Sequence, residues 1–160
     1  MTNEELSSQL VSVLLEKGLE IAQAESCTGG LLSKYITDQA GASKIFQCGL
    51  VTYSGDIKHR LLGVEEDTLR NFGEVSAETA REMADGVRRV AGSDIGVGIT
   101  GIAGPGGGSA EKPVGLVYFA VSYGEICEAV CLELFDLKTR EEIREKTIQS
   151  VLEYLLALLN

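Results

Sequence analysis

The sequence predicts an α/β fold: a three-layer α/β/α sandwich on a mixed, mostly parallel sheet with a late antiparallel hairpin. Three observations predict this fold. Short apolar segments alternate with amphipathic helical segments early in the chain, two strand-like segments follow each other directly near the end, and 44% of the 160 residues are hydrophobic. A chain of this size and composition can bury a sizeable core. We therefore expect a single domain over residues 1–160, with no linker or repeat.

Helix and strand alternate in the first half of the chain. Apolar residues recur at helical spacing over Glu4–Lys17, and Gly18 ends this helix as a C′ glycine. The elements expected next are a strand over Leu19–Ala24, a helix over Thr28–Gln39, a strand over Gln47–Tyr53, and short helices over Asp56–Leu62 and Glu66–Phe72.

The second half begins with Ser76, which is a good N-cap for a longer helix. Strands are expected over Ile95–Ile99, Val114–Val121 and Ile126–Phe135, and a last helix over Thr139–Leu159. The connection between the last two strands, at residues 123–125, is short enough to make this pair antiparallel. Ligand sites in such sheets gather at the carboxyl ends of the strands.

The charge balance excludes some partners. The net charge of −10 argues against a surface that grips nucleic-acid phosphates. The acidic start MTNEEL has no basic region before an apolar one, and no uncharged apolar run approaches the roughly 20 residues of a membrane span. We therefore expect a cytoplasmic protein that binds neither nucleic acid nor membrane.

The histidine content and the cysteine spacing make metal catalysis a less favoured expectation. The four cysteines form no CxxC pair, and His59 is the only histidine. Reduced thiols are expected, and neither a multi-histidine metal site nor a Ser-His-Asp triad can be assembled comfortably. We expect no metal and no cofactor.

Two glycine-rich segments follow strand-like runs and favour a bound anion. GVGITGIAGPGGGS spans Gly96–Ser109, and ESCTGG spans Glu25–Gly30 before a helical pattern. Backbone N–H groups can approach a ligand closely where side chains are missing, and a helix N-terminus attracts negative charge. The first segment formally contains GxGxxG, but no helix follows it, and it lacks the Lys and Ser/Thr of a Walker A loop. The SxxK of Ser109–Lys112 opens no helix either. A flexible turn is the structural alternative to a phosphate cradle.

The segment Gly41–Lys58 holds a serine, a tyrosine and a lysine. Ser43 needs a neighbour to take its proton, and with no suitable histidine the candidate bases are a lysine or a carboxylate. Lys58 qualifies only if its pKa falls from about 10.4 to roughly 7–8, which requires burial or a nearby cation. By spacing alone, these residues and Arg140 are ordinary turn, strand and surface positions.

Four motifs together resemble the CinA carboxy-terminal domain family. They are AESCTGG (Ala24–Gly30), GAS…F…GLVTYS…K (Gly41–Lys58), GEVSAETA (Gly73–Ala80) and GITGIAGPGGGSAEKPVGLVYFA (Gly98–Ala120). Stand-alone members similar to this chain are nicotinamide-nucleotide amidases of the PncC type. The resemblance implies hydrolysis of nicotinamide mononucleotide to nicotinate mononucleotide and ammonia, in pyridine nucleotide salvage.

The resemblance also implies a site. It makes Ser43 the nucleophile, Lys58 the general base and Tyr53 a hydrogen-bonding assistant, and it implies an acyl-enzyme intermediate without a metal. Backbone N–H groups of Gly41–Ser43 would then stabilise the oxyanion. The residues implied to bind the substrate are Ser26, Cys27, Thr28, Gly29, Gly41, Thr100, Gly101 and Arg140.

The sequence leaves alternatives for the activity, the nucleophile and the oligomeric state. The domain can instead be a non-catalytic nucleotide-binding regulatory module, which needs no neutral lysine. Cys27 is an alternative nucleophile, since nicotinamidases of another fold use cysteine. The family resemblance implies a homo-oligomer, whereas the sequence itself shows no self-complementary patch.

Overall fold

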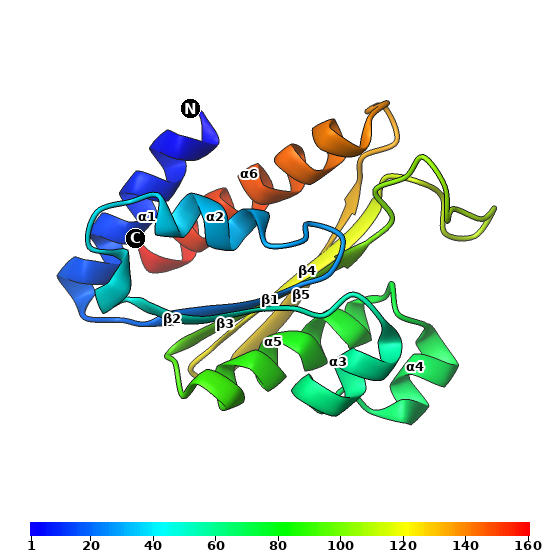
Figure 1. The fold of residues 1–160 in the computed structure, drawn as a ribbon, viewed down its shortest axis with the longest axis horizontal. Coiled ribbons are helices and arrows are strands. Elements are labelled where there is room, and N and C mark those ends of the chain that lie inside the picture. Colours follow the sequence, from blue (N-terminus) through cyan, green and yellow to red (C-terminus); the bar gives the residue numbers. More distant parts are fainter.

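The structure is a computed structural model that describes residues 1–160. A five-stranded sheet in the order β2-β1-β3-β4-β5 lies between two layers of helices (Figure 1), which confirms the predicted fold class. The strands are β1 (Ile21–Glu25), β2 (Phe46–Val51), β3 (Ile95–Gly101), β4 (Leu116–Tyr123) and β5 (Ile126–Glu133). The helices are α1 (Asn3–Lys17), α2 (Leu31–Thr37), the 3₁₀ turn η1 (Ala42–Lys44), α3 (Gly55–Leu62), α4 (Glu66–Phe72), α5 (Ala77–Ala91) and α6 (Arg140–Leu159).

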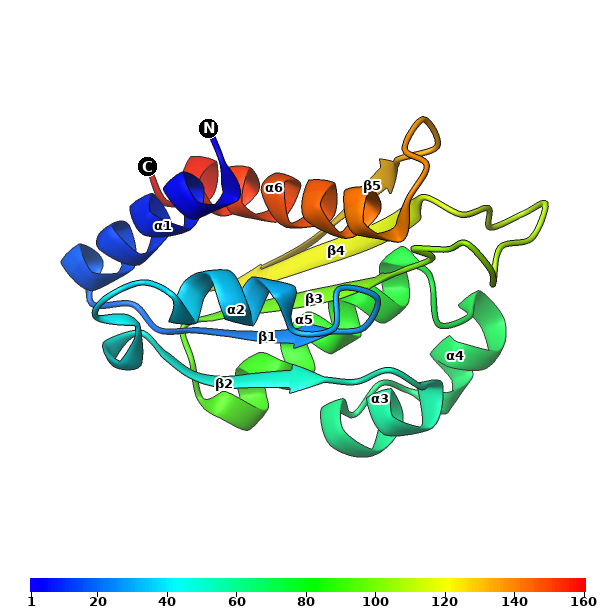
Figure 2. The ribbon, with the colours of Figure 1, turned by 45° about the horizontal axis from the view of Figure 1, so that its top comes forward.

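The strand directions bring four strand ends to one edge of the sheet. Strands β2 and β3 run parallel to β1, while β4 is antiparallel to β3 and β5 is antiparallel to β4. Only β4 therefore runs against the others, and the predicted late hairpin is confirmed. The carboxyl ends of β1, β2, β3 and β5 open toward the same side of the molecule (Figure 2).

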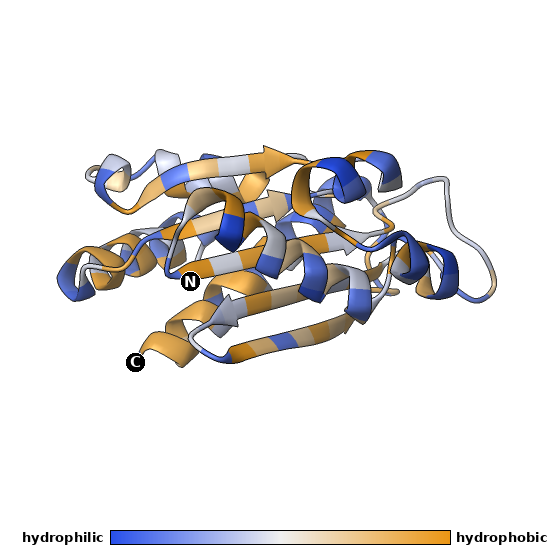
Figure 3. Cartoon of the chain, turned by 90° about the horizontal axis from the view of Figure 1, so that it is seen from below, coloured by the Kyte–Doolittle hydropathy of each residue, from blue (hydrophilic) through white to orange (hydrophobic).

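Helices lie on both sides of the sheet. Helices α1, α2 and α6 lie on one side, and α5 packs on the other face with α3 and α4 against it (Figure 1). The larger apolar cluster lies under α1 and α6, where Leu10, Leu14 and Leu152 are fully buried. Figure 3 shows the strands largely in the hydrophobic colour and the polar residues mostly on helices and loops. No helix is both long enough and apolar enough to cross a bilayer.

The predicted helix boundaries follow from their capping residues. Gly18 adopts a left-handed conformation and ends α1, and the Ser76 side chain caps α5 by accepting a hydrogen bond from Thr79 N. Thr139 forms a capping box with Glu142, which places Arg140 at the first position of α6. These caps confirm where α1 was predicted to end and where α5 and α6 were predicted to begin.

Helix α2 begins three residues later than predicted because the preceding glycines open a loop. Gly29 and Gly30 both have positive φ angles, of 58° and 100°. The segment from Ser26 to Gly30 is therefore a loop between β1 and α2 rather than the first turn of a helix.

Two glycines of the glycine-rich run pack a helix instead of cradling a ligand. A Cβ on Gly96 would lie 2.2 Å from the Ala84 carbonyl oxygen, and one on Gly98 would lie 2.4 Å from the Ala80 carbonyl oxygen. These glycines let α5 approach β3 closely. Only the part of the run from Thr100 onward is free to meet a ligand.

Candidate active site

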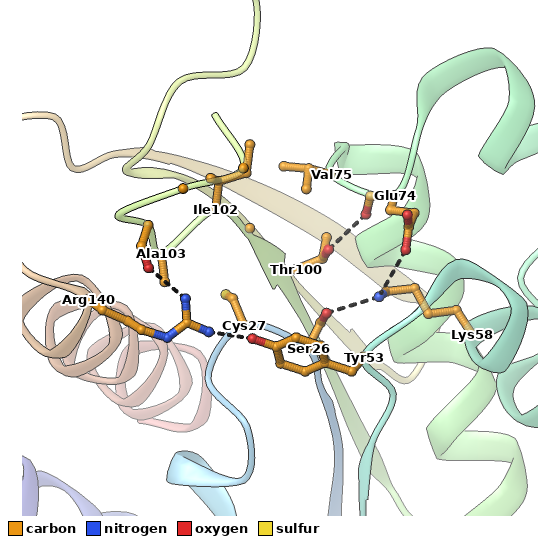
Figure 4. A pocket seen from close by; sticks show the side chains of 14 residues that line it. Ser26, Cys27, Tyr53, Lys58, Glu74, Val75, Thr100, Ile102, Ala103 and Arg140 are labelled. Carbon is orange, nitrogen blue, oxygen red and sulfur yellow. Dashed lines mark hydrogen bonds and ion pairs between the residues drawn. The ribbon is translucent and has the colours of Figure 1, made fainter. Parts of the chain in front are cut away.

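A pocket of about 240 Å³ opens at the carboxyl edge of the sheet (Figure 4). Its walls come from the segments that follow β1 and β2, from the end of β3 and the loop after it, from α3, from the connection between α4 and α5, and from the start of α6. The lining residues are Ser26, Cys27, Tyr53, Lys58, Glu74, Val75, Thr100, Gly101, Ile102, Ala103, Gly104, Gly106, Gly107 and Arg140.

Lys58 and Ser26 form a buried pair at the floor of this pocket. Lys58 lies in α3, and its residue is only 1% exposed. Its Nζ donates hydrogen bonds to Ser26 Oγ at 2.9 Å and to the Thr52 carbonyl oxygen at 3.0 Å. The structure thus brings a serine hydroxyl and a lysine amine within direct proton-transfer distance.

The surroundings of Lys58 favour its neutral form. Burial lowers the pKa of Lys58 below its ordinary value, because a charged amine loses hydration there. The Glu74 carboxylate opposes this effect from 3.8 Å, measured from Oε1 to Nζ, and raises the pKa of Lys58 in part. The half-exposed Glu74 side chain is a weaker influence than burial. A larger fraction of Lys58 is therefore unprotonated at neutral pH than for a surface lysine.

The backbone fixes Ser26 directly after β1. Ser26 N donates to the Ile99 carbonyl at 3.0 Å, and Thr52 N donates to the Glu25 carbonyl at 2.9 Å. These bonds continue the ladders of β1 with β3 and β2 beyond the strand. The next two amides, those of Cys27 and Thr28, donate to no acceptor in the protein. Free N–H groups next to a nucleophile are suited to stabilise an oxyanion.

The Glu25 carboxylate anchors the loop that carries Ser26. Glu25 is completely buried, and its oxygens accept four hydrogen bonds. The donors are Thr28 Oγ1 at 2.7 Å, Leu32 N at 2.9 Å, Ser33 N at 3.0 Å and Ser33 Oγ at 2.9 Å. One carboxylate therefore satisfies the first amides of α2 and ties the loop to that helix.

Glu25→Ala is expected to destabilise the fold by about 2–4 kcal/mol, because several buried donors lose their acceptor. Thermal or urea unfolding measures this change. Glu16→Ala, on the exposed side of α1, is the matched control and should stay within about 0.5 kcal/mol of the wild type. Equal stability of Glu25→Ala and Glu16→Ala would contradict the anchoring role.

Arg140 joins the glycine-rich loop to Tyr53 across the mouth of the pocket. Its Nη1 donates to the Gly104 carbonyl at 2.7 Å, and its Nη2 donates to Tyr53 Oη. On the opposite wall, the buried Thr100 hydroxyl donates to the Glu74 carbonyl at 2.8 Å and holds that segment in place. The open side of the pocket thus carries a guanidinium and a phenol.

Cys27 lies beside Ser26 but is poorly suited to act as a nucleophile. Its residue is 6% exposed, and burial raises the pKa of its thiol to about 12. The reactive thiolate is therefore scarce at neutral pH. The pocket favours an oxygen nucleophile over this sulfur.

Ser43 and Gly41 lie at the opposite edge of the sheet, so the predicted Ser43–Lys58 pair is wrong. Ser43 belongs to η1, which precedes β2, whereas Lys58 follows β2. The six residues of β2 separate them by about 20 Å. Gly41 and Ser43 line another cavity together with Thr37. The amides of Gly41–Ser43 therefore cannot serve an oxyanion formed at Lys58.

The other predicted residues lie at or behind the pocket. Ser26, Cys27, Tyr53, Lys58, Thr100, Gly101 and Arg140 line it. Thr28 and Gly29 do not line it: Thr28 is fully buried against Glu25, and Gly29 lies beside the Arg144 side chain. The lining residues not predicted individually are Glu74, Val75, Ile102, Ala103, Gly104, Gly106 and Gly107, of which the last five belong to the glycine-rich segment Gly96–Ser109. Glu74 lies in the GEVSAETA motif, but nothing local in that motif shows that its carboxylate meets Lys58.

Comparisons with known proteins agree with this architecture. The profile of the CinA C-terminal domain matches residues 3–159. A relative from Thermoanaerobacter sp. (strain X514) is 47% identical over 94% of this chain and 36% of its own length, and a CinA-like protein from Desulfovibrio desulfuricans is 57% identical over 73% of this chain and 28% of its own length. The chain thus spans about a third of the length of these curated relatives.

Solved structures share the whole fold. The crystal structure of a competence/damage inducible protein from Agrobacterium tumefaciens has a TM-score of 0.95 and 43% identity, covering 99% of this chain and 96% of that one. A CinA superfamily protein from Enterobacter cloacae has a TM-score of 0.95 and 35% identity, covering 100% of this chain and 94% of that one.

Fold and site together define an α/β domain with a ligand pocket at the carboxyl edge of its sheet and a buried serine–lysine pair at the pocket floor. Within that class, the chain belongs to the CinA C-terminal domain family.

Proposed function

We propose that this domain is a metal-independent amidohydrolase that converts nicotinamide mononucleotide to nicotinate mononucleotide and ammonia. The hydrogen bond from Lys58 Nζ to Ser26 Oγ carries the proposal, because it supplies an activated nucleophile without histidine or metal. The choice of substrate rests on the resemblance to nicotinamide-nucleotide amidases. An anionic nucleotide also suits a pocket that presents the Arg140 guanidinium and the unpaired Cys27 amide.

Acylation of Ser26 is the first half of the proposed reaction, and it uses the contact between Lys58 Nζ and Ser26 Oγ. Neutral Lys58 accepts the Ser26 hydroxyl proton as Oγ attacks the carboxamide carbon of the substrate. The resulting oxyanion receives a hydrogen bond from the unpaired amide of Cys27. The protonated Lys58 then gives its proton to the leaving nitrogen, so the C–N bond breaks and ammonia departs. Ser26 keeps the acyl group as an ester.

Deacylation repeats the same proton transfers with water. Lys58, neutral again, takes a proton from a water molecule that attacks the ester carbon. Collapse of the second tetrahedral intermediate breaks the bond to Oγ, and Lys58 returns the proton to Ser26. The products are a carboxylate and the regenerated hydroxyl. Tyr53, held by Arg140, lies at the pocket mouth, where it can orient the substrate.

A product assay tests the proposed function. Nicotinamide mononucleotide is incubated with the protein in the presence of a chelator, and ammonia and nicotinate mononucleotide are quantified. We expect stoichiometric release of both products. If the nucleotide binds but stays unchanged, the domain is a nucleotide-binding regulatory module instead of an amidase.

Glu74→Gln is expected to shift the pH profile toward acid. Lys58 must be neutral to act, and the Glu74 carboxylate raises the pKa of Lys58. Loss of this charge lowers that pKa, so the acidic limb of the pH profile of kcat/KM moves to lower pH, and by only a modest amount because solvent screens this pair. Glu16→Gln, far from the pocket on α1, should leave the profile in place. If the acidic limb of the kcat/KM profile of Glu74→Gln is unchanged or moves toward alkaline pH, Lys58 is not the titrating base.

A further inference from the structure

We propose that Arg140 and Arg144, one turn apart on α6, bind the phosphate group of the substrate, so that Arg144 makes the enzyme selective for the nucleotide over the nucleoside. The identity of the nucleotide rests on the proposed function. The anion site itself rests on the charges and hydrogen bonds around α6.

A second cavity lies next to the candidate active-site pocket, and Arg140 stands between the two. Its volume is about 450 Å³, and Arg140 lines both cavities. The lining residues are Leu31, Arg140, Glu141, Arg144 and Glu145. A substrate with its reacting amide at Ser26 can therefore extend past Arg140 toward Arg144.

Neither arginine has an acidic partner. The chain contains 24 acidic and 14 basic residues, yet no carboxylate lies within salt-bridge distance of Arg140 or Arg144. Arg140 donates to a carbonyl and a phenol, and Arg144 Nη2 donates to the Thr28 carbonyl at 2.7 Å. Two guanidiniums with only neutral acceptors, in so acidic a chain, keep their charge available for an anionic ligand.

Arg144 also retains unused donors beside an electropositive loop. Its Nε is buried and has no hydrogen-bond partner in the protein, and an unpaired buried donor is costly. A Cβ on Gly29 would lie 3.3 Å from Arg144 Nη2, so this guanidinium lies close to bare backbone. In the same loop the amide of the partly exposed Gly30 donates to no protein acceptor. Amides and guanidiniums together match the several oxygens of a phosphate.

The carboxylates of the second cavity limit but do not cancel this attraction. Glu145 Oε2 already accepts hydrogen bonds from Tyr35 Oη at 2.7 Å and Asn3 Nδ2 at 2.8 Å. Glu141 is exposed, so solvent and salt screen its charge. Glu141→Gln should therefore strengthen phosphate binding slightly, by about twofold.

The ratio of two substrates tests the proposal. We measure kcat/KM for nicotinamide mononucleotide and for nicotinamide riboside, which lacks the phosphate. Arg144→Gln is expected to lower kcat/KM for the nucleotide about 10- to 100-fold, as loss of a charge-assisted hydrogen bond does, and to change the riboside value less than threefold. Arg144→Lys should restore part of the nucleotide value. Arg70→Gln, which removes the same charge from exposed α4, should change neither.

If Arg144→Gln lowers kcat/KM equally for both substrates, Arg144 only holds the Thr28 loop in place. That result would overturn the proposal. If Arg144→Gln leaves kcat/KM unchanged for both substrates, the phosphate binds elsewhere, for example at the glycine-rich loop. That result would also overturn the proposal.

A binding measurement separates this inference from the amidase activity. Nicotinamide mononucleotide and inorganic phosphate are titrated into the protein carrying Ser26→Ala, with and without Arg144→Gln, and binding is followed by ³¹P NMR. Binding that weakens at least tenfold with Arg144→Gln supports the phosphate site, even if the wild type releases no ammonia. Binding of the nucleotide that is absent, or independent of Arg144, overturns it.

Discussion

Ser26→Ala is expected to lower the kcat for ammonia release by about 10³-fold or more, because removal of a nucleophile eliminates the acyl-enzyme route. Ser26 Oγ is the only hydroxyl that Lys58 Nζ contacts, so no second serine can take its place. The substitution removes one oxygen from a nearly buried position, and the fold should persist. Nucleotide binding should be retained. Steady-state ammonia release and a nucleotide titration measure the two properties.

The matched control is Ser43→Ala, which removes the same atom at the opposite edge of the sheet. Ser43 lies in η1 before β2, out of reach of Lys58, and its loss should change kcat less than twofold. Rapid quenching of the wild type followed by mass spectrometry should find the acyl group on the peptide that contains Ser26. An acyl group on Ser43, or full activity of Ser26→Ala, would refute the mechanism.

The fold was predictable because its elements carry local signals. Capping residues such as Thr139 and Ser76, and the glycine at position 18, mark where helices begin and end. The short connection around Gly124 fixed the antiparallel hairpin in advance. The start of α2 was the main misplaced boundary, since Gly29 and Gly30 adopt positive φ angles and the Glu25 carboxylate accepts hydrogen bonds from the amides of Leu32 and Ser33.

The nucleophile was predicted incorrectly for a topological reason that the sequence already contained. The predicted strand over Gln47–Tyr53 separates Ser43 from Lys58, so the two residues had to lie at opposite ends of that strand. Ser26, by contrast, follows β1, and Lys58 follows β2, and the ends of neighbouring parallel strands lie at one edge. Strand polarity, applied to each candidate, would have favoured Ser26.

Other parts of the site depend on tertiary contacts and have no local signal. Glu74 meets Lys58 only because α3 packs beside the start of α5, and Arg144 meets Thr28 only because α6 crosses the sheet near α2. Residue types and spacing cannot reveal such pairs. The low exposure of Lys58, on which its chemistry depends, is likewise a property of the assembled fold.

Lys58→Met is expected to abolish ammonia release, lowering kcat by about 10³-fold or more, because no other base contacts Ser26 Oγ. Methionine has a similar length and no charge, so it can fill the same buried volume. Lys44→Met, at an exposed position of η1, is the matched control and should leave activity unchanged. Residual activity of Lys58→Met comparable to that of Lys44→Met would assign the base elsewhere.

The same substitution also predicts a pH-dependent change in stability. Since folding lowers the pKa of Lys58, the wild type gains stability as pH rises through that lowered pKa toward the ordinary lysine value, and loses it as pH falls. Lys58→Met lacks this dependence. The mutant should therefore unfold at a higher temperature than the wild type at neutral pH, and the difference should shrink in alkaline buffer. Thermal unfolding of both proteins between about pH 6 and pH 10 measures it. A difference that is constant over this range would show that Lys58 is not desolvated, and the amine would then be too weakly perturbed to deprotonate Ser26.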